Sequence, residues 1–355
     1  MSNAADHQPT EARQQSPAIR DAWASYHQTI DAMRAELYAS DVLGMSNALQ
    51  INHYLAQIQA FAYHQVISPR QRTPVILGPS FFSVHGFRMG MQSPNFLYRA
   101  IYLDGAQEYR LFGQRGKTPF QQILVMRGGY NDAVPAQIGE YELDDFTDAD
   151  GRFDIRVGGS GEGLRIALDA ESGNNWLFMR ECFQDWSVTE AGDDMDIEPL
   201  AAFASIAQHP QDEAEVIRRL AGAERLIKVL HATASWPHFK LHNYDKTGPH
   251  QFSPLVHPKA AAYNPAAHYL YAFYQLQPDE ALIVEADGSA GFRFWDICSC
   301  DGWGQNTDFI YQQSSLTSAQ AVADADGRTR IVVSAQDPGV PNWLATGGLQ
   351  MGTLM

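Results

Sequence analysis

The stretch FLYRAIYLDGAQEYRLF, residues 96–112, decides the fold class of this chain. It holds two short apolar runs, Phe96–Leu103 and Tyr109–Phe112, on either side of a turn-forming segment. The same texture of apolar runs between Gly, Asn and Asp residues returns at Ile123–Val125, Leu164–Leu168, Ala281–Glu285, Phe292–Ile297 and Arg330–Ser334. This pattern is typical of antiparallel strands. The sequence therefore predicts a mainly β protein.

Two Asp-Gly sequences mark tight turns between strands. Asp148-Ala149-Asp150-Gly151 recurs as Asp324-Ala325-Asp326-Gly327, and Asp-Gly is a strong hairpin signal. A calcium loop would need an acidic residue two positions before each sequence, where Phe146 and Val322 stand. Both sequences are therefore predicted to be hairpin tips.

Three segments place apolar side chains at the spacing of an amphipathic helix. They are Asp21–Ser40, Ser46–Ile67 and Gln211–Ala232. Helical content is therefore expected at residues 18–70 and 205–235.

We expect the chain to divide into a flexible tail (1–17), a helical segment (18–72), a first β-sandwich domain (73–200), a helical connector (201–245) and a second β domain (246–355).

The composition excludes several classes of protein. Hydrophobic residues make up 45% of the 355, enough for a sizeable core, so a wholly disordered chain is excluded. The net charge is −16 and no cluster of Lys and Arg is present, so nucleic acid and an anionic membrane surface are not expected partners. Only 19% of residues are charged, while Trp, Tyr and Phe number 7, 15 and 18. This favours an aromatic cavity for a small hydrophobic molecule, or association into a homo-oligomer.

The sequence also suggests a compartment. Three cysteines are too few for a disulfide framework, and Met1–Gln15 has no apolar run of the kind that a signal peptide needs. The longest uncharged stretch, Ala260–Pro278, is interrupted by Asn, Pro and His and would make a poor membrane span. We therefore expect a cytoplasmic protein without a membrane span.

Standard catalytic motifs are missing from the sequence. There is no phosphate-binding loop, no NAD or nucleotide motif and no H-E-x-x-H sequence. Cys298-Ser299-Cys300 could offer two thiolates to a soft metal. In the favoured interpretation both cysteines lie on the same face of a strand, where successive side chains alternate, and belong to the core. Buried free Cys behaves as a small hydrophobe.

Histidines gather in one segment, residues 231–268, which holds six of the twelve. His238 and His242 are four apart, so one helical turn would place both imidazoles on one face as metal ligands. His250 and His257 extend the candidate set for haem b or non-haem iron, because neutral imidazole is the commonest ligand of such groups. The alternative is a loop with solvated side chains, and the residues leave both open.

Aromatic residues are enriched beside this segment. Side chains that could line a pocket for a flat apolar molecule are Tyr263, Tyr271, Trp295 and Trp303. Aromatic residues at alternate positions also pack the cores of β-sandwiches, so a structural role is open for each of them.

The last third of the chain resembles a known family. The similar segments are Pro278–Glu285, Phe294-Trp295, Asp308-Phe309, Ser315-Leu316, Gln320–Asp324, Asp326–Arg328 and above all Asp337–Leu344 (DPGVPNWL). They resemble the DUF1214 domain. Earlier segments are similar to longer proteins that carry this domain, including DUF1254 relatives: Ser93–Tyr98, Tyr109–Gly116 and Phe183–Trp186.

The resemblance implies two antiparallel β-sandwich, jelly-roll-like units with added helices and an N-terminal helical segment. Gln312 and Leu349 stand where the family often has His. The family itself implies no chemistry, because a fold does not specify a reaction. In size and texture the chain is also similar to trans-anethole oxygenase and related oxygenases, although no sequence motif carries that likeness.

Two functions of different classes follow. The first is an oxidoreductase, an oxygenase that acts on a hydrophobic aromatic substrate such as a propenylbenzene, with haem or iron held by the histidines. The second is a cofactor-free hydrolase or a carbohydrate- or lipid-binding β-sandwich protein. Its polar groups would be Asp308, Asp337, Glu280 and Glu285.

The octapeptide Asp337–Leu344 is predicted to be a structural corner. Its two prolines fix the backbone and remove hydrogen-bond donors, and Gly339 permits a tight reversal. Trp343 is expected to anchor the corner in the core.

Overall fold

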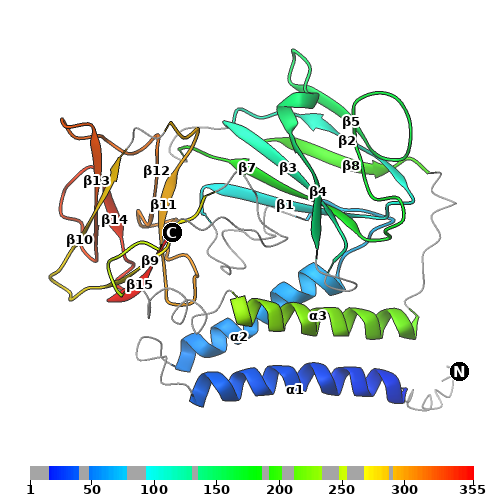
Figure 1. The fold of residues 1–355 in the computed structure, drawn as a ribbon, viewed down its shortest axis with the longest axis horizontal. Coiled ribbons are helices and arrows are strands. Elements are labelled where there is room, and N and C mark those ends of the chain that lie inside the picture. The colour runs from blue at the N-terminus through cyan, green and yellow to red at the C-terminus, as the bar shows by residue number, and fades with distance from the viewer. Residues whose placement is uncertain are drawn as a thin grey trace, which may run out of the picture.

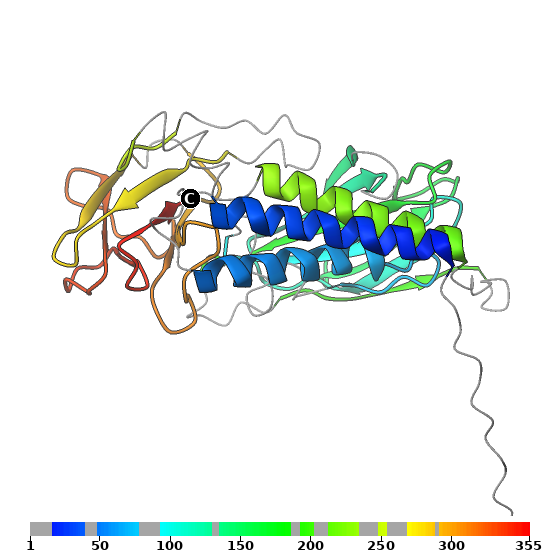
Figure 2. The same cartoon turned by 90° about the horizontal axis from the view of Figure 1, so that it is seen from below.

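The computed structural model describes residues 16–39, 48–77, 93–129, 135–185, 192–201, 212–233, 248–253, 268–287 and 291–355. Within them the chain forms two β units and a layer of helices (Figures 1 and 2). The helices lie together on one side of the first β unit, and the second β unit lies at one end. The prediction of a mainly β fold with added helices is confirmed.

The first β unit consists of two four-stranded sheets. The first sheet has the order β1 (Phe96–Leu103), β7 (Asn175–Cys182), β3 (Phe120–Arg127) and β4 (Ala136–Glu142). The second sheet has the order β6 (Arg165–Ile166), β5 (Arg152–Gly158), β2 (Glu108–Gln114) and β8 (Asp194–Pro199). A short 3-10 helix, Leu143–Phe146, follows β4.

Alternate side chains of these strands build a shared core between the two sheets. Ile101 and Leu103 of β1 meet Leu111 of β2 and Ile155 of β5 there, all of them at most 1% exposed. Successive side chains of a strand point to opposite faces, so the residues between these core positions lie on the outer faces. The unit is therefore a sandwich. The outer face of its first sheet is turned toward the helices (Figure 1).

The second β unit is a smaller sandwich. One sheet has the order β10 (Leu282–Asp287), β13 (Arg328–Ser334) and β14 (Trp343–Ala345). The other has the order β12 (Ser315–Thr317), β11 (Asp296–Cys300), β15 (Met351–Leu354) and β9 (Ala272–Gln275). Tyr274, Val333 and Leu344 are fully buried between the two sheets.

The helices are α1 (Pro17–Ala39), α2 (Ala48–Ala62), which continues as a π-helical turn at Tyr63–Ile67, and α3 (Glu213–Thr233). Their apolar stripes meet at Leu37, Ile58 and Ile227, none of which is exposed. Ser25 and Thr29 of α1 both donate hydrogen bonds to Glu224 of α3. Both predicted helical regions are thereby confirmed.

The predicted turns are also present. Gly151 and Gly327 have φ values of 79° and 80°, the left-handed conformation that favours glycine, and each donates its N–H to an Asp three residues earlier. Among the described strands, pairing is antiparallel except between β13 and β14 and between β5 and β6. The jelly-roll detail is not confirmed, and the domain limits stay a prediction.

The octapeptide forms the corner between β13 and β14. Asn342, 5% exposed, accepts the Val322 N–H and donates to the carbonyls of Val322 and Arg330. Trp343 is only half-buried, and its Nε1 donates to Ser334 Oγ at 3.0 Å. The corner is therefore held by the buried Asn342 amide as well as by Trp343, whose ring is only partly enclosed in the core.

None of the helices in the described ranges combines the length and the apolar character that a bilayer crossing requires.

Candidate functional site

The outer face of the first sheet carries an ordered set of aromatic side chains, which we call the aromatic face. Strand register defines its three rows. They are Tyr98–Arg180–Gln122, Ala100–Phe178–Leu124 and Tyr102–Trp176–Met126, each read across β1, β7 and β3. Six of these side chains form one hydrophobic cluster, with Tyr98 packed against it.

The rings of the aromatic face stack along and across the strands. Tyr98 lies parallel to Phe178, with 5.8 Å between ring centroids and 12° between planes. Tyr102 stacks on Trp176 at 5.8 Å and 20°, and Trp176 is tilted against Phe178 at 5.6 Å. A surface of stacked rings favours another flat ring, because offset stacking adds to the free energy of apolar burial.

Arg180 is the single charged side chain in these rows. It is 8% exposed, and its guanidinium lies over the Phe178 ring, 4.9 Å from the centroid. Its Nε is buried without a hydrogen-bond partner. The aromatic face therefore combines an apolar platform with one buried positive charge.

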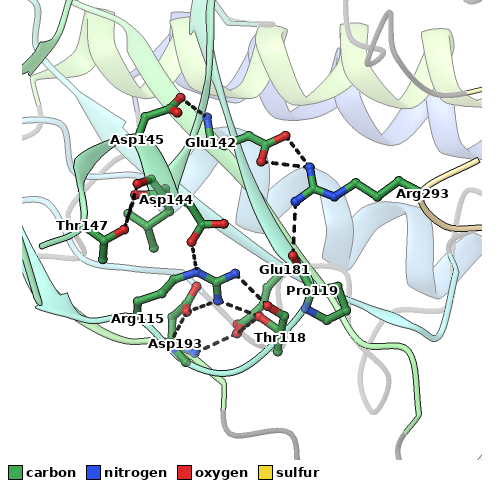
Figure 3. A network of polar contacts seen from close by, with 12 residues as sticks. Arg115, Thr118, Pro119, Glu142, Asp144, Asp145, Thr147, Glu181, Asp193 and Arg293 are labelled. Atoms are coloured by element: carbon green, nitrogen blue, oxygen red, sulfur yellow. Dashed lines mark hydrogen bonds and ion pairs between the residues drawn. The ribbon is translucent and has the colours of Figure 1, made fainter. Parts of the chain in front are cut away.

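One end of the aromatic face adjoins the second β unit. Phe294 contacts Phe96 and Phe120 edge-on, at centroid distances of 5.3 and 6.4 Å. Arg293 donates two hydrogen bonds to the Glu142 carboxylate at 2.7 and 2.9 Å, and Figure 3 shows this pair beside the Arg293 contact with the Pro119 carbonyl. These contacts hold the two β units together at a defined seam.

The other end adjoins the π-helical turn. Tyr102 donates a hydrogen bond of 2.6 Å from its hydroxyl to Gln65 Oε1. A cavity of about 10 Å³, room for one water molecule, lies there between Gln65, Tyr102, Asn174 and Trp176. Gln65 Nε2 is buried without a protein partner, so it is a natural donor to such a water.

Two ionisable groups lie close together at the seam. Burial raises the pKa of Tyr98 far above its ordinary range, which the Arg180 charge only partly opposes. Burial also raises the pKa of Asp296, against the stabilising hydrogen bonds that Asn95 and Ser93 donate to its Oδ2. Tyr98 is therefore a protonated phenol at neutral pH, able to donate a hydrogen bond.

Two other arginines of this unit show how buried guanidinium groups are ordinarily satisfied. Arg115 donates to Asp144 Oδ1, Thr118 Oγ1 and Asp193 Oδ1, each at 2.8 Å (Figure 3). Arg99 donates to Glu181 Oε2 at 2.6 Å. Burial and the nearby Glu181 charge raise the pKa of Asp193, while Gly116 and Arg115 oppose that rise. These arginines thus pair with carboxylates of the protein, which gives the network a structural role.

Most predicted metal and haem ligands fall outside the described residues. These are His238, His242 and His257, and the pocket residue Tyr263 lies outside them as well. His250 is described, and it is exposed with φ 66°, a conformation uncommon for a non-glycine residue. Its Nε2 lies 3.1 Å from the Gln275 nitrogen and 2.9 Å from the Gln275 oxygen, so this ring nitrogen already fastens the loop to β9.

The other predicted pocket residues belong to two different cores. Trp303 is 2% exposed and stacks on Tyr54 of α2 at 4.6 Å, and Tyr271 packs against the same helical core. Trp295 packs instead into the core of the second β unit. The structure thus brings Tyr271 and Trp303 to one cluster and Trp295 to another. A substrate pocket at these residues stays a prediction.

Three of the four carboxylates of the alternative function hold their own segment, and the fourth pairs with a neighbouring strand. Asp308 and Asp337 accept backbone N–H groups two residues further on, and Glu280 accepts the Gln277 N–H. Glu285 pairs with Arg330 and Arg328, which lowers its pKa. Within the part of the chain that the structure describes, no contact joins any two of these four side chains.

Cys298 and Cys300 are fully buried, as the apolar interpretation predicts. The Asn306 amide donates to both sulfur atoms at 3.6 Å, and the adjacent Cys300 thiol and burial raise the pKa of Cys298 well above its ordinary value. Within the described ranges, three His, Cys, Asp or Glu side chains nowhere gather as a metal site would require.

A second concave feature lies on the outer face of the second sheet. It is an open groove of about 490 Å³ between Phe112, Phe146, Arg110 and Arg152. Arg110 lies over the Phe112 ring at 4.5 Å, but it is exposed and pairs with both Asp154 and Glu198. Its charge is therefore already compensated.

Residues 281–353 match the model of a family described as a protein of unknown function, DUF1214. The chain is a DUF1214-containing protein. The DUF1214 region runs from the start of β10 into β15 and includes the Asn342 corner, so the predicted resemblance is confirmed for the last third of the chain.

The whole fold is similar to a solved structure. A crystal structure of an uncharacterized protein from Burkholderia cenocepacia superposes with a TM-score of 0.80 and 22% identity, over 96% of this chain and 94% of that one. A crystal structure of a Vibrio parahaemolyticus protein has a TM-score of 0.45 and 10% identity, over 95% of this chain and 93% of that one. No curated protein sequence matches the chain. The Burkholderia likeness shows the fold, and chemistry has to come from the site.

Proposed function

We propose that this DUF1214-containing protein is a small-molecule enzyme that binds a flat, hydrophobic aromatic substrate on the aromatic face. The observation that carries the proposal is the pair of ring stacks, Tyr98 on Phe178 and Tyr102 on Trp176, beside the buried Arg180. Stacked rings with a few polar groups at the edge are typical of small-molecule sites. The substrate class we propose includes the propenylbenzenes.

The reaction class we propose is an oxidation of that substrate, as in an oxygenase. Such chemistry needs a cofactor. Of the four candidate imidazoles the structure describes His250, and its Nε2 already holds the Gln275 backbone. We therefore derive no catalytic step through haem or iron. What the described residues supply is a stacking surface, a protonated Tyr98 and a buried positive charge.

A binding experiment tests the first half of the proposal. Trp176 lies 5.6 Å from Phe178, so a ring bound on the platform should change its fluorescence on titration with propenylbenzene. Phe178→Leu keeps most of the apolar volume and removes the ring, and it should weaken binding up to about tenfold, the value of a lost aromatic pair. Phe112→Leu on the other sheet is the matched control. Equal binding by both variants would refute the aromatic face as the site.

A second experiment tests the reaction. The purified protein, supplied with haem or with ferrous iron and a reductant, should consume oxygen when propenylbenzene is added. Binding without any oxygen consumption under either condition would overturn the oxygenase class and leave the binding site in place.

A further inference from the structure

Arg180 differs from the other largely buried arginines of its β unit. Arg99 and Arg115 each contact a carboxylate that is fully buried, Glu181 and Asp193 respectively. Among the described residues, no carboxylate lies within ion-pair distance of Arg180 and no acceptor takes a hydrogen bond from its guanidinium. Even so, the Arg180 side chain is buried, with only 8% of its surface exposed to solvent.

This arrangement is energetically unbalanced. Removing a charged group from water is expensive, and proteins ordinarily compensate it with an opposite charge and with hydrogen bonds. The stack on Phe178 returns only part of that loss, because a cation–π contact is weaker than the hydration it replaces. The site is therefore complementary to an anion that can accept the free N–H groups.

We propose that Arg180 is the anchor for the carboxylate group of an aromatic acid whose ring stacks on the aromatic face. The inference rests on the proposed function, since it names the substrate class of the same site. A planar guanidinium presents paired N–H donors whose spacing matches the two oxygens of a carboxylate. Because the guanidinium lies on Phe178, an anion bound to it sits beside the rings that would hold the rest of the molecule.

The neighbours of Arg180 in its row fit this assignment. Tyr98 is its partner on β1 and carries a protonated hydroxyl, while Gln122 is its partner on β3 and already donates to Glu140 at 2.6 Å. The row thus contains one positive charge and no second cation, which suits a carboxylate of single charge. A phosphate dianion ordinarily meets several cations or a helix N-terminus.

The net charge of the chain disfavours nonspecific binding of anions at other places on the surface. The chain has a net charge of −16, so anions in solution are repelled from most of its surface. Specific binding of an organic anion therefore requires a local, desolvated positive charge that no carboxylate in the described part of the chain neutralises. Arg180 has these properties, whereas Arg110 in the groove of the second sheet is paired twice.

The test compares cinnamate with its neutral relative cinnamamide in calorimetric titrations of the full chain. The parent should bind cinnamate at least about tenfold more tightly than cinnamamide, as expected for a charged hydrogen-bonded pair. Arg180→Gln should remove that preference and leave cinnamamide affinity unchanged. Arg180→Lys, which keeps the charge without the fork, should retain part of the preference. Arg110→Gln, also stacked on a Phe, is the matched control and should behave as the parent.

The outcomes separate this inference from the proposed function. Equal affinity for the two ligands in the parent, or an unchanged cinnamate preference in Arg180→Gln, would overturn the carboxylate anchor while the aromatic site stands. If neither cinnamamide nor propenylbenzene binds, but acetate raises the Tm of the parent and not of Arg180→Gln, the anion anchor stands and the aromatic site falls. Circular dichroism of each variant confirms folding, and the Arg180→Lys titration decides if Arg180→Gln fails to fold.

Discussion

Glu181 shows at the scale of single residues why paired and unpaired arginines have different roles. Its carboxylate is fully buried and accepts hydrogen bonds from Arg99, the Thr118 hydroxyl and the Asp193 N–H. The Arg99 guanidinium compensates a charge that water cannot reach. Arg180, in the neighbouring row of the same strand pair, pairs with no carboxylate among the described residues.

Arg99→Gln should therefore destabilise the protein strongly. It leaves the buried Glu181 charge without its cation, and breaking a buried ion pair in this way costs about 3–5 kcal/mol. Urea unfolding followed by circular dichroism measures the change. Arg110→Gln removes an exposed arginine from the other sheet and should have a much smaller effect, because water screens exposed ion pairs. Equal losses in the two variants would contradict the structural assignment of the buried network.

The corner between β13 and β14 shows how one element of the DUF1214 region is held. A parallel pair needs a connection that returns the chain to the same end of the sheet, and residues 335–342 provide it within a few residues. Asn342 makes this possible because its amide substitutes for the missing backbone partners of Val322 and Arg330. The requirement is for a specific hydrogen-bonding side chain, since hydrophobic packing alone would leave those backbone groups unsatisfied.

Asn342→Ala should lower the free energy of unfolding by about 1–3 kcal/mol, because the buried Asn342 amide no longer bonds the backbone groups of Val322 and Arg330. Thermal unfolding of the purified variant measures this. Asp337→Ala, in the same octapeptide, removes a hydrogen bond to Gly339 on an exposed turn and should have a much smaller effect. A loss in Asp337→Ala as large as that in Asn342→Ala would show that the turn itself, and not the buried amide, holds the corner.

At the scale of the whole molecule, the seam joins the two β units through groups of different chemistry. Phe294 packs edge-on against Phe96 and Phe120, Arg293 pairs with Glu142, and Asp296 accepts hydrogen bonds from Ser93 and Asn95. The aromatic face borders this seam, so the position of the second β unit sets one edge of the candidate site. Changes at the seam should consequently affect both stability and ligand binding.

Asp296 makes the stability of the seam depend on pH. Burial raises the pKa of its carboxyl above 3.8, so the folded state binds the proton more tightly than the unfolded state does. The resulting stabilisation is complete below pH 3.8 and is lost as the pH rises through the folded pKa. An amide side chain cannot ionise, so the Tm of Asp296→Asn should equal or exceed that of the parent at neutral pH. As the pH is lowered, the Tm of the parent should rise relative to that of Asp296→Asn.

Scanning calorimetry at a series of pH values from below 3.8 to neutral checks this prediction. Asp154→Asn is a control of opposite sign, because the hydrogen bond from Arg110 lowers the pKa of Asp154. The parent should lose stability relative to Asp154→Asn as the pH falls. A Tm difference between the parent and Asp296→Asn that does not change with pH would refute the assignment.

The sequence by itself determined those features that depend on near neighbours in the chain. Apolar residues at helical spacing located α1, α2 and α3, and apolar runs between Gly and Asp turns located strands such as β1, β2, β3, β10 and β13, because these periods follow from backbone geometry. The Asp-Gly turns and the burial of Cys298 and Cys300 follow from the same local rules. The segments that resemble DUF1214 also lie close together in the chain.

Only the tertiary structure decided which side chains meet. Tyr98 and Arg180 come from strands far apart in the sequence, and they become neighbours because β1 pairs with β7 in one particular register. A shift of one residue would have turned the whole aromatic face inward. The sequence does carry a signal for this face, because aromatic residues and Arg180 recur at every second position in Trp176, Phe178 and Arg180. That signal does not reveal which strand is the partner. Trp303, predicted from sequence to line a pocket, packs on Tyr54 for the same reason: contacts between distant segments depend on how whole elements pack, which no local pattern encodes.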